Sequence, residues 1–398
     1  MIQQSLQITR AEFDARAAAL LAHVQAENLD GVVLFDNFHI VYCTGFAFFP
    51  TERPIAFVMN RHGEKALFVP SLEVEHARLQ TGFARVDQYV EYPSDPHPME
   101  VLKTTLVDMG VTGRIGADGD GYPPIFGYRG PSLTGLMGVQ PVPVGDAIED
   151  LMAIKSPAEL ALIRESIKWA NLAHRLLQRY TRVGATETEA SLRAGHEATL
   201  AMIDTLGPLY RAQSMFWEGA GAIYRGQVGR HSAIPHVMAN NVVFQPGDVL
   251  VSGTLAPLWG YNSEIERTMI IGPASSEQQR LFAHMKAAQE VAFDAIRPGA
   301  TCADVDRAVR AYFVEHDLMA YWKHHSGHGL GLRNHEGPFL DAGDHTVLRP
   351  GMVFAVEPGL YAPDLGGFRH SDTVLVTETG SELLTYYPRD LESLTIPL

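Results

Sequence analysis

The amino-acid sequence predicts two domains, an α/β domain followed by an α+β domain. The chain has 398 residues, which is enough for two hydrophobic cores. In residues 1–150, short apolar runs alternate with helical stretches, as they do in α/β domains. In residues 151–398, the helical stretches are grouped, and residues 319–398 carry mostly strand and turn patterns. We therefore expect antiparallel strands with segregated helices in the second domain, and we place the boundary near Asp150.

The elements of the first domain follow from caps and apolar runs. Thr9 and Glu12 form a capping box, which predicts a helix to about Glu27. Ile55–Met59 and Lys65–Val69 flank a short turn and predict a hairpin. Gly119–Gly138 is rich in glycine and proline, so we expect a loop or a broken helix there. The other expected elements are strands at Gly31–Phe35, His39–Thr44, Val86–Tyr92 and Arg114–Ala117, and helices at Leu72–Leu79 and Met99–Met109.

The second domain begins with a strong helix start. Ser156 as the N-cap, Pro157 at the first helical position and Glu159 two residues later predict a long helix to about Arg182. The remaining expected elements are helices at Glu187–Leu206, Glu277–Ile296 and Ala303–Leu318, and extended segments at Gln213–Trp217, Val242–Phe244, Val249–Ser252, Arg267–Ile271, Val353–Val356 and Thr373–Val376.

Composition narrows the class of protein and its partners. The formal net charge is −15, so nucleic acid and anionic membranes are not expected partners. Cys43 and Cys302 are the only cysteines, which argues against a cysteine-rich zinc site and against a disulfide framework. The N-terminal residues lack the pattern of a signal peptide, and no apolar run approaches the ~20 residues of a membrane span. We therefore expect a cytoplasmic protein.

The stretch from His324 to Asp372 holds the densest set of candidate functional residues. His324, His328 and His335 follow one another closely among glycines, which let a backbone approach a ligand. Glu357 ends an apolar run, so its carboxylate is expected at the rim of a sheet, and Arg369 precedes the last strand. Surface histidines with a salt-bridged glutamate would give the same pattern, but several titratable groups that converge between strands favour a site.

Three further clusters qualify as candidates. His236 follows a proline, although a loop histidine bound to water is the simpler interpretation. Glu264 and Glu266 are two positions apart on an expected strand, so their side chains share a face. Two adjacent carboxylates are costly unless a cation, a proton or a metal lies between them; alternatively, one of them pairs with Arg267 or lies in solvent. Arg53 could clamp a carboxylate, and a solvated loop arginine is an equally good interpretation.

Six motifs, in order along the chain, connect these clusters to a known family. They are SAIPH, PGD, GYNSEIERT, GHGLGLRNHE, VEPGLY and GFRHSDTVLVTETG. In these motifs the chain resembles the creatinase / aminopeptidase P / prolidase / methionine aminopeptidase family, M24. The resemblance implies a creatinase-type N-terminal α/β domain at residues 1–150 and a pita-bread catalytic domain of α+β type at residues 151–398. It also implies a homodimer, with Arg53 reaching the active site of the partner chain.

The resemblance also bears on metal binding. The family's metallopeptidases hold two metal ions through two aspartates, a histidine and two glutamates; the corresponding positions here, in that order, are Gly253, Glu264, His328, Glu357 and Ser371. Two of these positions have lost a carboxylate that a dinuclear site needs. We therefore expect no dinuclear centre and no cofactor, with one weakly bound divalent metal possible at Glu264, His328 and Glu357.

The site is similar to that of metal-free creatinase. The similarity implies His236 as general base and Glu266 and Glu357 as groups that hold a cationic substrate. Pro338 and Thr51 depart from creatinase, so creatine itself is not expected as the substrate. The hypothesis is a metal-independent hydrolase of a C–N bond in a small amidine, guanidine or amide. The expected catalytic residues are His236, Glu266, Glu357, His328 and His335, and the expected substrate-binding residues are Arg53, Tyr261, Glu264, His324 and Arg369.

Two alternatives stay open. The first is a metal-dependent Xaa-Pro dipeptidase or aminopeptidase with an altered metal site, which the histidines and Arg369 support and which Gly253 and Ser371 oppose. The second is a pita-bread protein that has lost catalysis and binds a partner, which the retained histidines and glutamates oppose.

Overall fold

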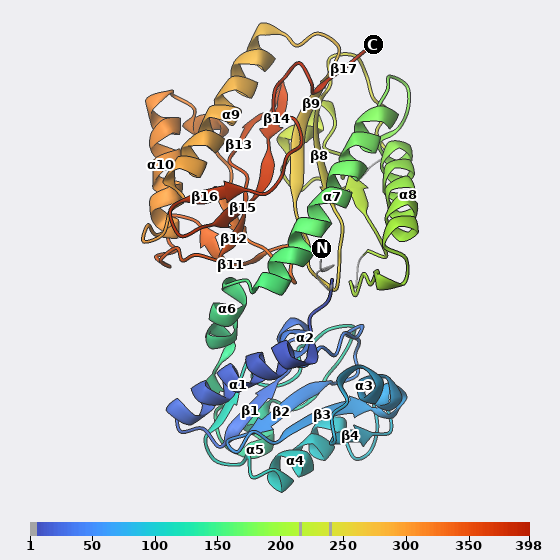
Figure 1. The fold of residues 1–398 in the computed structure, drawn as a ribbon, viewed down its shortest axis with the longest axis vertical. Coiled ribbons are helices and arrows are strands. Elements are labelled where there is room, and N and C mark those ends of the chain that lie inside the picture. Colours follow the sequence, from blue (N-terminus) through green and yellow to red (C-terminus); the bar gives the residue numbers. More distant parts are fainter. Residues whose placement is uncertain (1–5, 215–216, 239–240) are drawn as a thin grey trace, which may run out of the picture. The chain divides into compact units, whose positions relative to one another are not determined.

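The computed structural model describes residues 6–214, 217–238 and 241–398. The chain divides into two compact units, one spanning Ile8–Met152 and the other containing Ala153–Leu398 (Figure 1). Within the described ranges, no helix combines the length and the apolarity needed to cross a membrane.

The N-terminal unit is an α/β domain built on a mixed six-stranded sheet in the order β4-β3-β2-β1-β5-β6. Strand β1 pairs antiparallel with β2 and parallel with β5. Leu102 and Leu106 of α4 join Val33 and Phe68 of the sheet in one buried core cluster. The elements are α1 (Arg10–Ala26), β1 (Gly31–Leu34), α2 (Asn37–Thr44), β2 (Ala56–Asn60), β3 (Lys65–Pro70), α3 (Val74–Thr81), β4 (Val86–Tyr89), α4 (Pro98–Asp108), β5 (Ile115–Ala117), α5 (Leu133–Met137), β6 (Val142–Pro143) and α6 (Gly145–Ala153).

Local caps explain where this unit agrees with the sequence and where it does not. The predicted hairpin is confirmed, since β2 and β3 pair antiparallel. The strand expected at His39–Thr44 is wrong, because that segment forms helix α2. Asp36 caps the helix by accepting hydrogen bonds from the backbone N–H groups of Phe38 and His39, and Gly45 ends it with φ +77°. Both helix ends are thus satisfied, and this outweighs the β-propensity of the apolar run.

The C-terminal unit is built on one large sheet accompanied by helices, as expected for a pita-bread domain. Its main sheet runs β11-β10-β12-β15-β9-β8-β7, with β16 beside β15 and β17 beside β9, while β13 and β14 form a separate hairpin. The elements are α7 (Pro157–Tyr180), α8 (Glu187–Leu206), β7 (Gly221–Ile223), β8 (Val249–Leu255), β9 (Ile265–Ile271), α9 (Ser276–Ala295), α10 (Cys302–Glu315), β10 (Gly327–Gly329), β11 (Glu336–Leu340), β12 (Val353–Val356), β13 (Gly359–Ala362), β14 (Gly366–Arg369), β15 (Ser371–Val376), β16 (Ser381–Leu383) and β17 (Thr395–Ile396).

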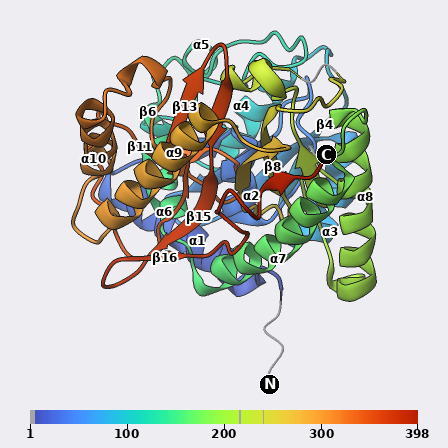
Figure 2. The same ribbon diagram turned by 90° about the horizontal axis from the view of Figure 1, so that it is seen from above.

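Two helix pairs accompany the two halves of this sheet. Helices α7 and α8 pack on β7 and β8, whereas α9 and α10 pack on β12 and β11 (Figures 1 and 2). Capping boxes at Ser156, Ser275 and Thr301 begin α7, α9 and α10, as the sequence predicts for the first of these. The strands that the two halves contribute therefore meet in the middle of the sheet, at β9 and β15.

Two expected extended segments differ from the structure. Residues 215–216 of the segment predicted at Gln213–Trp217 lie outside the described residues, and its described residues form no strand. The segment predicted at Val242–Phe244 makes a single bridge, between Val243 and Thr186, because it is a short connection that runs past the start of α8.

Candidate active site

Four neighbouring strands bring the predicted site residues together. Strands β10, β12, β15 and β9 are adjacent in the sheet. The register sets Ser371 opposite Glu266 and His328 opposite Ala355, two residues before Glu357. Glu264 lies directly before β9. Groups that are more than a hundred positions apart in sequence thus share one face of the sheet.

Three carboxylates crowd this face. Oxygens of Glu264, Glu266 and Glu357 lie within 4.8 Å of one another. Burial raises the pKa of Glu264 and of Glu357, and the negative charge of Glu266 adds to the effect. Burial acts on Glu266 in the same sense, but the adjacent Arg369 guanidinium outweighs it and lowers the pKa of that carboxyl. The cluster therefore favours a bound cation or shared protons.

Arg369 supplies positive charge inside the cluster. Its Nε and Nη2 donate to the two carboxylate oxygens of Glu266, the latter at 2.7 Å, and Nε lies 3.4 Å from Glu357 Oε2. Its Nη1 donates to the hydroxyl of Tyr361 at 3.0 Å, and the Tyr361 hydroxyl lies 2.6 Å from His324 Nε2. Burial and the charge of Arg369 lower the pKa of His324 to about 3, so His324 is neutral and fixed in position.

His328 presents a buried nitrogen that has no hydrogen-bond partner. Its Nδ1 donates to the carbonyl of Gly329 at 2.9 Å, and because a carbonyl only accepts, the proton is on Nδ1. The lone pair on Nε2 has no hydrogen-bond partner and lies 3.5 Å from Glu357 Oε1 and 4.0 Å from Glu264 Oε2. A side chain at Gly327 would lie 2.1 Å from the carbonyl oxygen of Ala355, so glycine is required beside this histidine.

The two positions that have lost carboxylates are filled by other groups. A Cβ at Gly253 would lie 3.4 Å from Glu266 Oε1, so the Glu266 carboxylate occupies the space beside that glycine. Ser371 donates through Oγ to Glu264 Oε1 at 2.6 Å. The residues present do not fit two ions. They fit one, because the open Nε2 of His328 lies 3.5 Å from Glu357 and 4.0 Å from Glu264, which together offer nitrogen and oxygen ligands. A ligand atom of His335 also lies within 4.8 Å of those of Glu264 and His328.

A cavity of about 550 Å³ opens onto this cluster. Its described lining residues are Ile234, Pro235, His236, Lys323, His324, His325, His335, Glu357 and Arg369. The His335 ring stacks on His328 with centroids 3.7 Å apart. Partial burial and the charges of Arg225 and Arg369 lower the pKa of His236, which makes the neutral imidazole the dominant form near pH 7. The cavity therefore joins a proton acceptor to the carboxylate cluster.

Two cationic residues near the site were missed by the sequence argument. Arg225 has φ +56° and lies 3.8 Å from Glu266 Oε1, and no sequence signal predicts that backbone conformation for an arginine. Lys323 lines the cavity and directly precedes His324, so its position beside a candidate residue was a usable signal.

Two predicted substrate contacts are engaged elsewhere. Tyr261 is buried, and its hydroxyl donates to Glu159 at 2.7 Å. Arg53, in the N-terminal unit, pairs with Glu52 at 2.7 Å and with Glu91 at 2.6 Å. Their roles in substrate binding remain predictions, and each would require an existing partner to be displaced.

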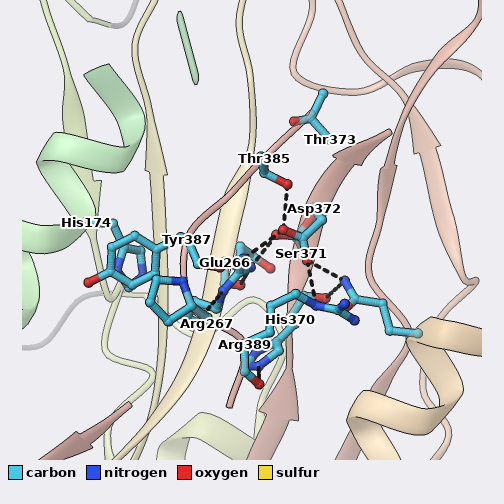
Figure 3. A network of polar contacts seen from close by, with 12 residues as sticks. His174, Glu266, Arg267, His370, Ser371, Asp372, Thr373, Thr385, Tyr387 and Arg389 are labelled. Atoms are coloured by element: carbon cyan, nitrogen blue, oxygen red, sulfur yellow. Dashed lines mark hydrogen bonds and ion pairs between the residues drawn. The ribbon is translucent and has the colours of Figure 1, made fainter. Parts of the chain in front are cut away.

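The opposite face of β9 and β15 carries a separate buried network (Figure 3). Arg267 uses all of its N–H groups, and the acceptors are Pro388 O (2.8 Å), Glu266 O (2.7 Å), Ser371 O (3.0 Å), Tyr387 O (3.0 Å) and Asp372 Oδ1 (2.7 Å). Asp372 also accepts from Thr385 Oγ1 at 2.6 Å and from Gln289 Nε2 at 3.0 Å. This network holds the two central strands together behind the site.

Comparison with known proteins gives a consistent relationship. The profile of Metallopeptidase family M24 matches residues 161–378, and that of the Creatinase/Prolidase N-terminal domain matches residues 16–151. The probable dipeptidase PepE of Mycobacterium tuberculosis is 31% identical over 96% of both chains. The Xaa-Pro dipeptidase of Pyrococcus furiosus is 28% identical over 94% of this chain and 99% of its own length.

Solved structures agree. The dipeptidase PepE from Mycobacterium ulcerans has a TM-score of 0.80 at 26% identity, and it covers 98% of this chain and 100% of its own. The prolidase from Pyrococcus horikoshii has a TM-score of 0.78 at 26% identity, and it covers 95% of this chain and 99% of its own.

These relatives bear on two expectations from the sequence, the metal independence of the enzyme and its hydrolysis of a C–N bond. The expectation of a metal-independent amidine or guanidine hydrolase without a cofactor is not supported, since the relatives are named dipeptidases and their family is one of metallopeptidases. A metal-dependent peptidase is the better supported alternative. The expectation of an enzyme that hydrolyses a C–N bond is confirmed, and the chain belongs to metallopeptidase family M24.

Proposed function

We propose that the protein is a dipeptidase that hydrolyses short peptides with one divalent metal ion at Glu264, His328 and Glu357. The observation that carries the proposal is the buried Nε2 of His328, a lone pair with no hydrogen-bond partner that faces two carboxylates. Leaving a buried polar atom without a partner costs free energy, so such atoms are rare. A nitrogen that binds a metal ion is expected to lack a hydrogen-bond partner in the protein without the ion. The dipeptidase names of the relatives support the substrate class.

The same geometry supports one ion rather than two. Glu266 is held by Arg369, with Arg225 3.8 Å away, so the side of the cluster next to Gly253 is already neutralised by arginines. When bound, a divalent ion would act as a Lewis acid on the carbonyl of the scissile peptide bond.

The chain's own residues would do the rest. His236, neutral near pH 7 and on the cavity wall, would take the proton from the attacking water. Arg369, Tyr361 and His324 form a hydrogen-bonded row that fixes the carboxylates and the cavity wall. His335, stacked on His328, would donate a hydrogen bond to the oxygen that becomes negative during attack.

Metal titration tests the proposal directly. Isothermal calorimetry of the dialysed protein with Mn²⁺, Co²⁺ or Zn²⁺ should give one equivalent, and Glu357→Gln or His328→Ala should remove it. Glu382→Gln, an exposed glutamate paired with Arg164, is the control and should bind as the native chain does. Two equivalents would overturn the single-ion site. Undiminished cleavage of Xaa-Pro dipeptides in chelator would overturn metal dependence and restore the metal-free hypothesis.

A homodimer and a cytoplasmic location remain predictions of this proposal. We expect a dimer by light scattering at micromolar concentration, and a monomer would contradict it. Arg53→Ala should leave folding intact, because the ion pairs of this partly exposed side chain lie near the surface, where such pairs are worth about 1 kcal/mol or less. If Arg53 reaches the partner's site, the same variant should raise KM for peptides that carry a free carboxylate.

A further inference from the structure

The positive charges around the cavity differ in what they contact. Arg369 is committed to Glu266, Glu357 and Tyr361. Lys323 also lines the cavity, but it has no carboxylate within ion-pair distance in the part of the chain that the structure describes. An ammonium group carries three N–H donors, and the Lys323 Nζ spends one on the carbonyl of Ala233 at 2.8 Å. The Lys323 side chain is exposed, so its other two donors are open to a ligand in the cavity that it lines.

The surroundings of Lys323 hold its ammonium in place. Its Nζ lies 5.7 Å from the ring centroid of Tyr361, whose hydroxyl is fixed by Arg369 and His324. The carbonyl it contacts belongs to Ala233, three residues before His236. Lys323 thus links the segment that carries His236 to the segment that carries His324, and both segments line the cavity.

The lining of the cavity carries charges of both signs. Glu357 belongs to the carboxylate cluster proposed to hold the metal ion, whereas Lys323 places a cation with no carboxylate partner among the described residues on the same lining. A dipeptide is a short zwitterion with an ammonium at one end and a carboxylate at the other. A cavity of about 550 Å³ is of the size that binds small molecules of this kind.

We propose that Lys323 binds the free C-terminal carboxylate of the substrate and so restricts the enzyme to short peptides with an unblocked C-terminus. The inference rests on the proposed function and names the residue that sets its substrate class. It also distinguishes Lys323 from Arg53, whose guanidinium already contacts two carboxylates in its own unit. A hydrogen bond between two charged groups of this kind contributes on the order of 10- to 100-fold in affinity.

The test compares free acids with amides. Ala-Pro and Ala-Leu are assayed as free acids and as C-terminal amides with the native chain, Lys323→Met and Lys323→Arg. We expect Lys323→Met to raise KM for the free acids by about 10- to 100-fold with kcat nearly unchanged, to leave the amides unaffected, and Lys323→Arg to restore part of the loss. Lys103→Met is the matched control, since the Lys103 ammonium also donates to a backbone carbonyl, that of Leu136 at 2.9 Å, but in the N-terminal unit.

Binding separates failure of this inference from failure of the proposed function. If the native chain cleaves neither peptide, calorimetry with the same acid and amide pairs still measures recognition of the carboxylate. Tighter binding of the acids that is lost in Lys323→Met supports the clamp without any turnover. Equal binding of acid and amide, or an equal loss for both in Lys323→Met, overturns it.

Discussion

The charged residues on the two faces of strands β9 and β15 differ in how completely their charges and hydrogen-bonding groups are satisfied. On one face, Glu264, Glu266 and Glu357 lie within 4.8 Å of one another, and the buried Nε2 of His328 has no hydrogen-bond partner. On the other face, Arg267 satisfies every N–H group and pairs with Asp372, and both side chains are fully buried (Figure 3).

This difference separates binding from stability within one pair of strands. A buried cluster that leaves like charges together and a lone pair open gains free energy when a cation arrives. A buried pair whose groups are all satisfied gains nothing from a ligand, and removing one partner leaves the other charged and desolvated. The first face should therefore govern turnover and the second should govern folding.

The largest expected effect tests the cavity side of this comparison. His236→Ala should lower kcat by about 10²- to 10⁴-fold and leave KM nearly unchanged, because a general base acts chiefly in the transition state. Steady-state kinetics on a cleaved dipeptide, with urea unfolding alongside, measures both. His231→Ala is the control. If His236→Ala keeps most of the activity, the base assignment is wrong and Glu264 or Glu266 becomes the candidate.

The second prediction tests the opposite face. Arg267→Met should cost about 3–5 kcal/mol in the free energy of unfolding, because the buried Asp372 would lose its nearer cation and four backbone carbonyls would lose their donor. Arg389, 3.4 Å from the other carboxylate oxygen of Asp372, would remain. Urea unfolding of the C-terminal unit measures this loss. Arg164→Met, which breaks an exposed pair with Glu382, should cost about 1 kcal/mol or less. Equal losses in the two variants would remove the distinction between the faces.

The third prediction concerns His39, a buried histidine whose two ring nitrogens both have partners, unlike His328. The expected effect is smaller. Burial lowers the pKa of His39, but hydrogen bonds to Asp118 and Glu149, each at 3.0 Å, outweigh burial and raise the pKa to about 9. The resulting stabilisation is complete below the unfolded-state pKa of about 6.5 and is lost as pH rises through 9. It is on the order of 3 kcal/mol for the N-terminal unit.

Urea unfolding at pH 6.5 and at pH 9.5 measures that contribution. The native N-terminal unit should lose stability across this interval, and His39→Gln should show a flatter dependence on pH. A native unit whose stability does not change between these pH values would show that His39 is not charged in the folded state.

Much of the fold could be predicted from short-range signals. Ser156, with Pro157 and Glu159, correctly begins α7, and the β2–β3 hairpin follows from two apolar runs around a turn. The failure at α2 has a local cause that was present in the sequence: Asp36 and Gly45 cap the helix at its two ends, and the β-branched residues between them suggested a strand.

The site was less accessible to sequence reasoning. Alternation correctly predicts that Glu264 and Glu266 share a face, because it depends only on strand geometry. The partners of these carboxylates depend on register between distant strands and on loop conformation. The left-handed backbone of Arg225, which sets its guanidinium near Glu266, is fixed by tertiary context and has no local sequence signature.

The contact between Gly253 and Glu266 constrains the order in which this site can change. Gly253→Asp made first would place a new carboxylate beside that of Glu266, and we expect the like charges to lower stability before any gain in metal affinity. The same substitution after Glu266→Gln would meet a neutral neighbour, and Ser371→Glu could then complete a second ion site. We therefore expect sign epistasis between these substitutions, with the effect of Gly253→Asp depending on whether Glu266 still carries its charge.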